Sequence, residues 1–294
     1  MSMPAWTAAL ACVALAACAP DAVIASVPRD AGVDALQVDV GFACPIGRGA
    51  AMANLGDHCI DLTEVTKAQY AAFLAATPLP SSQAPECAWN VDFGPRRTST
   101  TDFGGDTSCD EALDPDVNDA TKFPARPMVC VDWCDAAAYC AWAGKRLCGA
   151  RGGGSDGIID DPGNTLNDAT KSEWYSACVG PRATAYPYGA TFDGSACFTR
   201  DDTVTAPVDV ASQPACHGPA GTANAAIYDL SGNVAEWTQA CRAGGDGRTT
   251  SCEARGGWWK DTRPGSQACA VDPLVKIVWP RGRSDNHIGF RCCG

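Results

Sequence analysis

The stretch of sequence that decides the fold is AIYDLSGNVAEWT, residues 226–238. Gly232 and Asn233 lie at its centre, and both residue types favour the backbone conformations of tight turns. Such a turn brings the carboxylates of Asp229 and Glu236, seven residues apart, toward a common centre. A hard cation could bind both carboxylates. Alternatively, Asp229 accepts backbone N–H groups and Glu236 pairs with an arginine.

The composition of the chain points to a loop-rich protein that folds outside the cytosol. The chain has 294 residues, of which 46% are hydrophobic, enough to bury a core. Its 30 glycines and 20 prolines predict many turns and little long helix. The formal net charge of -12 argues against nucleic acid as a partner. The 18 cysteines favour an oxidising compartment.

The N-terminus carries the features of an export signal. Residues 5–17, AWTAALACVALAA, form an apolar run too short to span a membrane and typical of a signal-peptide core. The following LAAC, residues 15–18, resembles a bacterial lipobox, in which Cys18 is lipidated. An ordinary secretory signal cleaved nearby is the alternative. We therefore expect a lipid-anchored protein of the bacterial cell envelope, periplasmic or surface-exposed.

This interpretation divides the chain into three parts. We predict a lipoprotein-type signal peptide at 1–18, a flexible tether at 19–40 and a folded domain at 41–294. The tether contains no cysteine and no aromatic residue. Sixteen cysteines remain from Cys44 onward, an even number that permits eight disulfides whose pairing the sequence does not reveal.

Three short helices are predicted from capping residues and apolar stripes. In the first, within 63–78, Thr66 and Gln69 have capping-box spacing, and Pro78 ends the helix. One face of this helix should be buried, and its members are Tyr70, Phe73, Leu74 and Thr77.

The other two helices lie within 131–147 and 167–181. Asp132 and Asp135 should cap the second helix, and Gly144 lies where a left-handed residue ends a helix. Thr170 and Glu173 have capping-box spacing in the third, which Gly180 should stop. Short strands and long loops between the helices predict an irregular α+β domain.

Eight motifs, in order along the chain, resemble one known family. They are CIDLTEVTKAQYAAFL (59–74), RPMVCVDWCDAAAYCAWAGKRL (126–147), TKSEWYSAC (170–178), YPYG (186–189), TAPVDV (205–210), AIYDLSGNVAEWT (226–238), ARGGWW (254–259) and IGFRCC (288–293). Together they resemble the sulfatase-modifying-factor, or formylglycine-generating-enzyme, domain family. The resemblance covers residues 59–293. It implies a disulfide-rich, irregular α+β fold related to C-type lectin domains.

The family's enzymes oxidise a sulfatase cysteine to formylglycine with oxygen and copper(I). Two thiolates hold the copper, which suits this soft ion. The family places them four and nine residues after the second glycine of its GGS segment, and the matching positions here hold Asp261 and Ser266. Trp258 replaces the family serine. Cys269 is either a displaced copper ligand or half of a structural disulfide.

Other metals receive less support from the pattern. A sister branch of the family binds iron through histidines, but His58, His217 and His287 are scattered here. The cysteine spacings do not form the paired knuckles of a zinc site.

The resemblance also implies a structural calcium site in the 226–238 turn. The matching ligands are the side chains of Asp229 and Glu236 and the backbone carbonyls of Gly232 and Val234. Carboxylate and carbonyl oxygens are the ligands that Ca²⁺ prefers.

Two long loops and a tryptophan-rich segment are candidates for ligand binding. Residues 148–169 are an insertion relative to the family, with Cys148 at its base and Asp156, Asp160 and Asp161 as a possible cation site or a solvated loop. Residues 86–123 form a second long loop, stapled by Cys87 and Cys109. A groove for sugars or peptides is predicted from aromatic faces beside polar groups. Its residues are Arg255, Trp258, Trp259, Asp261, Trp279 and Arg281, although at least one tryptophan should instead fill the core.

Two functions from different classes remain open. The first is a non-catalytic, disulfide-stapled module that binds an unidentified protein, peptide or glycan. The second is a divergent formylglycine-generating oxidase with Cys269 as a displaced copper ligand. Free thiols distinguish them, because only the oxidase needs reduced cysteines.

Overall fold

The computed structural model describes residues 42–97, 108–112, 114–199, 206–243 and 247–294. Contacts between residues divide the chain into 1–39 and 40–294, so the second unit begins close to the predicted domain start at 41. The predicted signal peptide, tether and lipidated Cys18 lie outside the described residues. No described helix has the length and apolar character needed to cross a membrane.

Residues 40–294 contain two small four-stranded sheets. The first has the strand order β1-β2-β8-β3 and is antiparallel. Its strands are β1 (Met52–Asn54), β2 (Cys59–Asp61), β3 (Arg146–Leu147) and β8 (Cys292–Cys293). The second has the order β6-β5-β4-β7, with β4 and β7 parallel and the other pairs antiparallel. Its strands are β4 (Ala235–Cys241), β5 (Ser251–Arg255), β6 (Ile277–Pro280) and β7 (Ile288–Phe290).

The C-terminal segment belongs to both sheets. β7 pairs with β4 in the second sheet, and β8 pairs with β2 and β3 in the first. Only Arg291 separates these two strands. The last seven residues of the chain therefore join the sheets.

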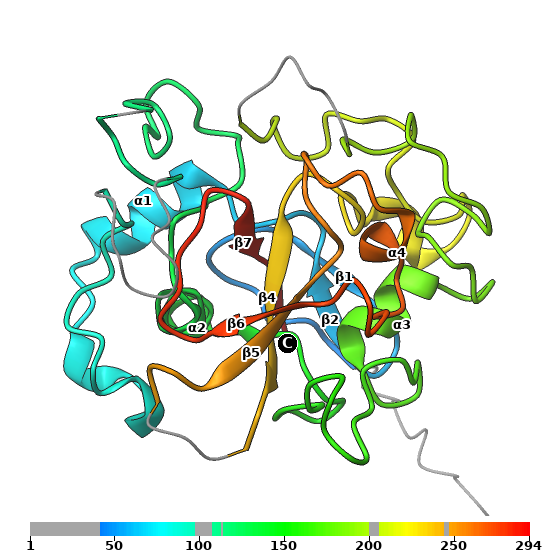
Figure 1. Ribbon diagram of the computed structural model, residues 1–294, viewed down its shortest axis with the longest axis horizontal. Helices are drawn as coiled ribbons and strands as arrows, with labels where there is room; N and C mark the ends of the chain where they lie inside the picture. Colours follow the sequence, from blue (N-terminus) through cyan, green and yellow to red (C-terminus); the bar gives the residue numbers. More distant parts are fainter. Residues whose placement is uncertain (1–41, 98–107, 113, 200–205, 244–246) are drawn as a thin grey trace, which may run out of the picture. The chain divides into compact units, whose positions relative to one another are not determined.

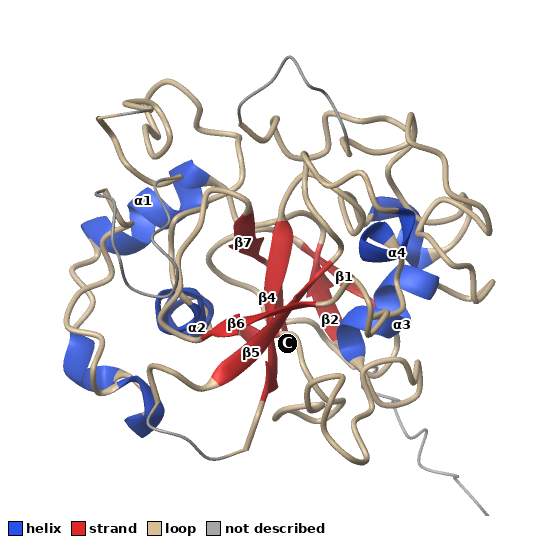
Figure 2. Cartoon of the chain, viewed as in Figure 1, coloured by secondary structure: helices blue, strands red, loops and turns tan. Residues whose placement is uncertain are grey.

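Helices flank the second sheet. They are α1 (Lys67–Ala75), α2 (Trp133–Trp142), α3 (Glu173–Val179), α4 (Pro264–Gln267) and the 3-10 helices Pro80–Ser82, Pro85–Cys87 and Ala223–Ala226. α1 and α2 lie on one side of β4, and α3 and α4 lie on the other (Figure 1). Loops make up most of this unit (Figure 2). The predicted α+β architecture with few short elements is confirmed.

The predicted caps of the first two helices are present. Thr66 and Gln69 form the capping box of α1, and Asp132 and Asp135 form that of α2. Gly144 adopts the left-handed conformation beyond α2, with φ of 75°. These caps depend on residues three apart in sequence, so local pattern is enough to predict them.

Two details of the helix predictions are wrong. Ser172, not Thr170, caps α3, because its side chain accepts a hydrogen bond from the Tyr175 N–H. The Thr170 hydroxyl instead donates to Asp168 in the preceding turn, at 2.6 Å. Thr77 is exposed beyond the end of α1 and does not extend its buried face.

Aromatic rings from α1 and α2 pack around the C-terminal strand. The Tyr139 ring of α2 lies 5.4 Å from Phe290 of β7 and 5.7 Å from both Tyr70 and Phe73 of α1. A second cluster surrounds Trp174 of α3. Burial of these large side chains is the main favourable contribution of the short helices to folding.

Eight disulfides bind all sixteen cysteines of the described unit. The pairs are Cys44–Cys59, Cys87–Cys134, Cys109–Cys130, Cys140–Cys292, Cys148–Cys293, Cys178–Cys269, Cys197–Cys216 and Cys241–Cys252. The predicted even pairing is confirmed, as are the staples of both long loops. Two adjacent bonds attach β8 to α2 and to the insertion, at sequence separations of 152 and 145. Disulfides of this number place the unit in an oxidising, extracytoplasmic compartment.

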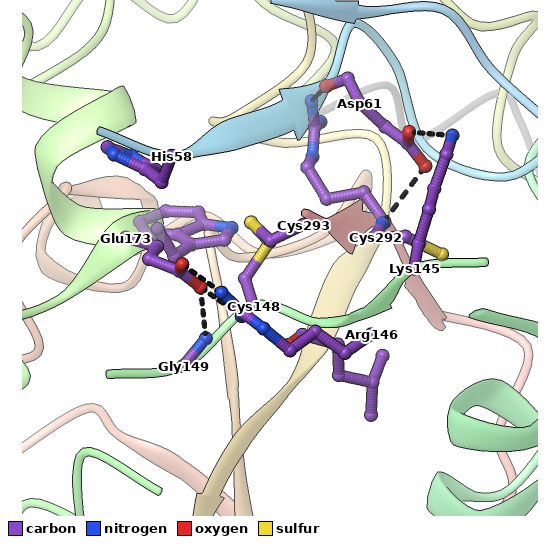
Figure 3. Close-up of a disulfide and its surroundings, with 12 residues drawn as sticks. His58, Asp61, Lys145, Arg146, Cys148, Gly149, Glu173, Cys292 and Cys293 are labelled. Atoms are coloured by element: carbon purple, nitrogen blue, oxygen red, sulfur yellow. Dashed lines mark hydrogen bonds and ion pairs between the residues drawn. A yellow bond between two sulfur atoms is a disulfide. The ribbon is translucent and has the colours of Figure 1, made fainter. Parts of the chain in front are cut away.

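Figure 3 shows how ion pairs flank the Cys148–Cys293 bond. Lys145 contacts Asp61 at 2.5 Å, and the other Asp61 oxygen accepts the Cys292 N–H at 3.0 Å. Arg146 pairs with Glu173, which also accepts the Gly149 N–H at 3.1 Å. The junction between the sheets is thus both covalently and electrostatically fixed.

The two adjacent disulfides should stabilise the fold non-additively. With either bond intact, the other closes a loop of only roughly nine residues, worth about 2–3 kcal/mol. We expect the variants Cys140→Ala/Cys292→Ala and Cys148→Ala/Cys293→Ala each to lose that amount. The variant lacking both bonds should lose about 1–2 kcal/mol more than the sum, because a far longer loop opens. Denaturant unfolding without reductant measures these differences.

The Cys241–Cys252 bond provides the control for this comparison. Its separation is 11 residues, and it joins neighbouring strands of the other sheet. Its removal should add to either single deletion within about 0.5 kcal/mol. Simple additivity of the two C-terminal deletions would contradict the shared-loop explanation.

Candidate functional site

The two positions that match the family's copper ligands hold engaged oxygen side chains. Asp261 is 4% exposed and accepts hydrogen bonds from Arg263, from Nε at 2.9 Å and from Nη2 at 2.6 Å. Burial opposes ionisation of Asp261, but hydrogen bonds from Arg263 and Ser266 outweigh it and hold the pKa of Asp261 below its usual value. The Ser266 hydroxyl donates to the Arg263 carbonyl at 2.8 Å.

No thiol is available to replace these ligands within the described residues. Cys269, the proposed displaced ligand, forms a disulfide with Cys178 and is 1% exposed. The other fourteen cysteines of residues 42–294 are paired as well. Copper(I) needs thiolate ligands, so the residues present do not fit this ion.

A line of partly exposed aromatic and basic side chains lies beside Asp261. The Trp258 ring is 4.7 Å from the His287 ring, and His287 is 5.2 Å from the Trp279 ring. Arg263 lies 5.7 Å from the Trp258 ring, and Arg283 lies 4.2 Å from the Trp279 ring. We call these five residues the tryptophan–histidine row.

Buried Asp285 contacts two members of the row, His287 and Arg283. It contacts His287 Nδ1 at 2.5 Å and accepts a hydrogen bond from Arg283 at 2.8 Å. The Ser108 hydroxyl donates to the same carboxylate at 2.8 Å. Asp285 therefore orients one imidazole and one guanidinium of the surface.

The other predicted groove residues lie elsewhere. Trp259 is 4% exposed and belongs to the core, as predicted for at least one tryptophan. Arg255 is 3% exposed, packs 4.6 Å from the Trp174 ring and donates to the Cys269 carbonyl at 2.9 Å. Arg281 lies 4.5 Å from the Trp133 ring. The single groove predicted from sequence is therefore wrong, because sequence proximity does not reveal which face a guanidinium covers.

Sequence reasoning missed three members of the row. His287 was set aside as an isolated histidine, and Arg263 and Arg283 were not considered. The spacing WxxxxR at 258–263 and the run WPRGRSDNH at 279–287 contain all five residues. The pairings of β5 with β6 and of β4 with β7 bring these two segments toward each other.

The turn at 226–238 holds an ion pair where calcium was predicted. Arg291 donates to both Glu236 oxygens, from Nε and from Nη2, each at 2.7 Å. The Trp174 indole donates to Glu236 at 2.8 Å, and the Ala211 N–H donates to Asp229 at 2.6 Å. This matches the alternative in which an arginine and backbone N–H groups satisfy the carboxylates. The predicted calcium ligands as arranged do not fit a cation beside the guanidinium, and no described group of three or more Asp, Glu, His or Cys side chains is placed to hold a metal.

The Gly-Asn residues of the turn serve packing. A side chain at Gly232 would place its Cβ 2.4 Å from the Phe198 carbonyl oxygen, so only glycine allows this approach. The Asn233 side chain accepts the Val208 N–H at 3.0 Å. The predicted carbonyl ligands, Gly232 and Val234, thus belong to a turn that docks two neighbouring segments.

Buried Glu64 lies close to this ion-pair network. Burial raises the pKa of Glu64 well above its usual value, and the nearby Asp229 charge raises it further. Burial also raises the pKa of Asp229 to about 6, with the Ala211 N–H opposing the shift. The protonated form of Glu64 is therefore favoured in the folded protein.

The acidic residues of the insertion do not converge on a cation. Asp160 pairs with Lys276 at 2.5 Å, and Asp161 contacts Arg242 at 3.3 Å. Asp156 is 4% exposed, so it is not part of a solvated run. The insertion is more deeply packed than a surface loop, since Ile158 is fully buried.

The comparisons with known proteins identify the family of the chain. The chain belongs to the sulfatase-modifying factor enzyme 1-like domain family, whose model matches residues 37–294. It is similar to the inactive C-alpha-formylglycine-generating enzyme 2 of Mus musculus, 32% identical over 176 residues, covering 56% of this chain and 48% of that protein. The Bos taurus protein of the same name is 32% identical over 182 residues, covering 56% and 49%. The chain spans about half the length of these curated relatives.

Solved structures with a similar chain path were also found. CarF matches with a TM-score of 0.47 and 18% identity, covering 86% of this chain and 95% of that one. PvdO from Pseudomonas aeruginosa matches with a TM-score of 0.46 and 18% identity, covering 84% and 90%. The family and fold predicted from the eight motifs are confirmed, whereas the relation to C-type lectin domains stays a prediction.

Arginine, not calcium, should neutralise Glu236. Arg291→Met leaves a buried carboxylate without its partner, and we expect a loss of about 3–5 kcal/mol in the free energy of unfolding. The double variant Arg291→Met/Glu236→Gln should recover much of that loss, because it no longer leaves the Glu236 carboxylate as a buried charge without its partner. EGTA should leave the melting temperature of the wild type unchanged. A melting temperature that falls with EGTA and returns with Ca²⁺ would restore the calcium hypothesis.

The free energy of unfolding should decrease as the pH rises from 4.5 to about 7, because of the Glu253 carboxyl. Burial raises the pKa of this carboxyl to about 7 from 4.5, against the opposing charge of Arg255. Between these pH values the folded protein binds more protons than the unfolded chain, so the free energy of unfolding decreases with pH. Glu253→Gln should remove about 3 kcal/mol of this decrease between pH 4.5 and 7. Denaturant unfolding at several pH values tests this, and parallel curves for variant and wild type would refute it.

Proposed function

We propose that this protein is an extracytoplasmic binding module of the sulfatase-modifying-factor family that does not make formylglycine. One observation carries the proposal: every cysteine of the described unit is in a disulfide, and Asp261 and Ser266 occupy the thiolate positions. The similarity to relatives named as inactive formylglycine-generating enzymes supports it. The lipobox-like LAAC at 15–18 supports attachment to a bacterial membrane through Cys18.

The tryptophan–histidine row is the proposed binding surface. Its two indoles and one imidazole offer flat faces, which stack on sugar rings or on aromatic and proline side chains. Arg263 and Arg283 lie at the two ends of the row. Each guanidinium is already paired with a carboxylate, Arg263 with Asp261 and Arg283 with Asp285, so the two residues offer N–H donors to a ligand more than free positive charge. The proposed ligand is therefore a glycan or peptide that combines flat apolar faces with hydrogen-bond acceptors.

The proposed lack of formylglycine synthesis can be tested, with a variant that restores the two cysteines as the comparison. A sulfatase peptide containing the target cysteine is incubated with copper(I) and oxygen, and formylglycine is measured by mass spectrometry. We expect no conversion by the wild type, because it has no thiolate pair. Asp261→Cys/Ser266→Cys should bind copper(I) where the wild type does not. Conversion of the peptide by the wild type would establish the oxidase alternative.

The binding surface can be tested with glycan and peptide arrays. Trp258→Ala/Trp279→Ala should weaken binding of any captured ligand by about 10-fold or more, since each stacking contact contributes about 1 kcal/mol. Trp89→Ala, which removes a partly exposed indole outside the row, is the matched control. Equal binding by both variants would exclude the row as the surface.

A further inference from the structure

A polar pocket lies between the insertion and the second sheet. Its volume is about 780 Å³, and residues 154–157 and 161–165 of the insertion form one wall. Gln239 and Cys241 of β4 and Arg281, directly after β6, contribute to the others. None of the five residues of the row lines it. A volume of this size accommodates a small molecule.

Arg281 presents a buried positive charge to this pocket without a carboxylate partner. The residue is 7% exposed, and its Nε has no hydrogen-bond partner. One Nη donates weakly to the Gly247 carbonyl, at 3.4 Å, and the guanidinium packs 4.5 Å from the Trp133 ring. In the described part of the chain no ion pair neutralises it; Glu86 acts on it only through longer-range attraction. A buried guanidinium in this state is costly unless an anion can reach it.

Asp156 presents a buried acceptor to the same pocket. It is 4% exposed, and its Oδ1 has no hydrogen-bond partner. It comes from the insertion, so the pocket is lined by unsatisfied groups from distant parts of the sequence, and the Asp156 carboxyl also interacts with Ser172 and Arg255. An unsatisfied donor and an unsatisfied acceptor at one cavity define complementary ligand groups.

Hydrogen bonds between the insertion and β4 hold the pocket in shape. The Gly154 N–H donates to the Gln239 side chain at 3.0 Å, and the Ser155 hydroxyl donates to the Cys241 carbonyl at 3.1 Å. At Gly149 an added Cβ would lie 2.3 Å from the Gly154 carbonyl oxygen, so the loop turns back tightly on itself. The pocket is therefore formed before any ligand binds, which lowers the cost of binding.

We propose that this pocket binds a small carboxylate that also carries hydroxyl or ammonium groups. The planar guanidinium of Arg281 holds the carboxylate through two parallel hydrogen bonds. Asp156 accepts hydrogen bonds from the hydroxyl or ammonium groups. Sugar acids and free amino acids share this chemistry. The site is independent of the proposed function, because it uses neither the row nor the thiolate positions.

Isothermal titration with two panels tests the proposal and separates the two sources. One panel contains glucuronate and galacturonate, and the other contains alanine and glutamate. We expect one panel to bind, and glucose and the methyl ester of the bound acid to bind at least about 30-fold more weakly. Absence of binding by both panels, or equal binding of the neutral compounds, would overturn the proposal.

Variants assign the binding to the pocket. Arg281→Gln should reduce the affinity by about 30-fold, and Asp156→Asn by about 10-fold. The affinity of Arg281→Lys should lie between those of the wild type and Arg281→Gln. Lysine keeps the positive charge but cannot form the two parallel hydrogen bonds of a guanidinium. Arg48→Gln, which removes an exposed guanidinium that lies over the Trp142 ring and does not line the pocket, is the matched control and should bind as the wild type does. An affinity unchanged by Arg281→Gln would overturn the assignment.

The melting temperature shows whether a variant loses affinity only because its fold is less stable. Arg281→Gln breaks no ion pair, so its melting temperature without ligand should equal or exceed that of the wild type. The bound acid should raise the wild-type melting temperature and leave that of Arg281→Gln unchanged. If the variant is markedly less stable without ligand, Arg281 is a structural residue and the proposal fails.

Discussion

The buried ion pair between Arg291 and Glu236 is the contact on which the two sheets depend. Arg291 is the one residue between β7 and β8, and Glu236 lies in β4 beside the turn at 226–238. Both side chains are about 1% exposed. The guanidinium also donates to the carbonyls of Asp61, at 3.1 Å, and Tyr228, at 2.8 Å. One side chain thus connects both sheets and the turn that precedes β4. Two disulfides then attach the same segment to α2 and to the insertion.

This arrangement separates the framework of the family from its chemistry. The framework motifs, from the α1 capping box to IGFRCC, make the buried contacts that hold the sheets together. Of the two copper positions, Asp261 lies in the loop after β5 and Ser266 lies in α4, and both side chains bond to Arg263. Replacement of the thiolates therefore leaves the framework intact, which explains how a chain can belong to the family without its catalytic ligands. Loops on such a crosslinked framework can vary in sequence at little cost to stability.

The sequence was sufficient to predict the structural features that depend on residues close together in the chain. The capping boxes at Thr66 and Asp132, the glycine stops and the even cysteine count all rest on local spacing or simple counting. The predicted groove failed because Arg255 and Trp259 lie close to Trp258 in sequence but are buried. The tryptophan–histidine row and the polar pocket depend on strand pairings and disulfides that join residues far apart in sequence. Arg291 was visible inside IGFRCC, and a single charge within an apolar motif indicates a buried ion pair. Its partner, Glu236, could not be assigned without the pairing of β4 with β7.

Whether the cysteines are free thiols or disulfides tests most directly whether this domain lacks the copper site of the family's enzymes. The full chain should be secreted through its own N-terminal segment, alkylated under native conditions and mapped by peptide mass spectrometry. We predict that none of the sixteen cysteines from Cys44 to Cys293 is labelled before reduction, and that Cys178 and Cys269 are recovered as one linked pair. Labelling of Cys269 together with a second cysteine would contradict the binding-module interpretation, because it would reveal the thiol pair that copper(I) requires.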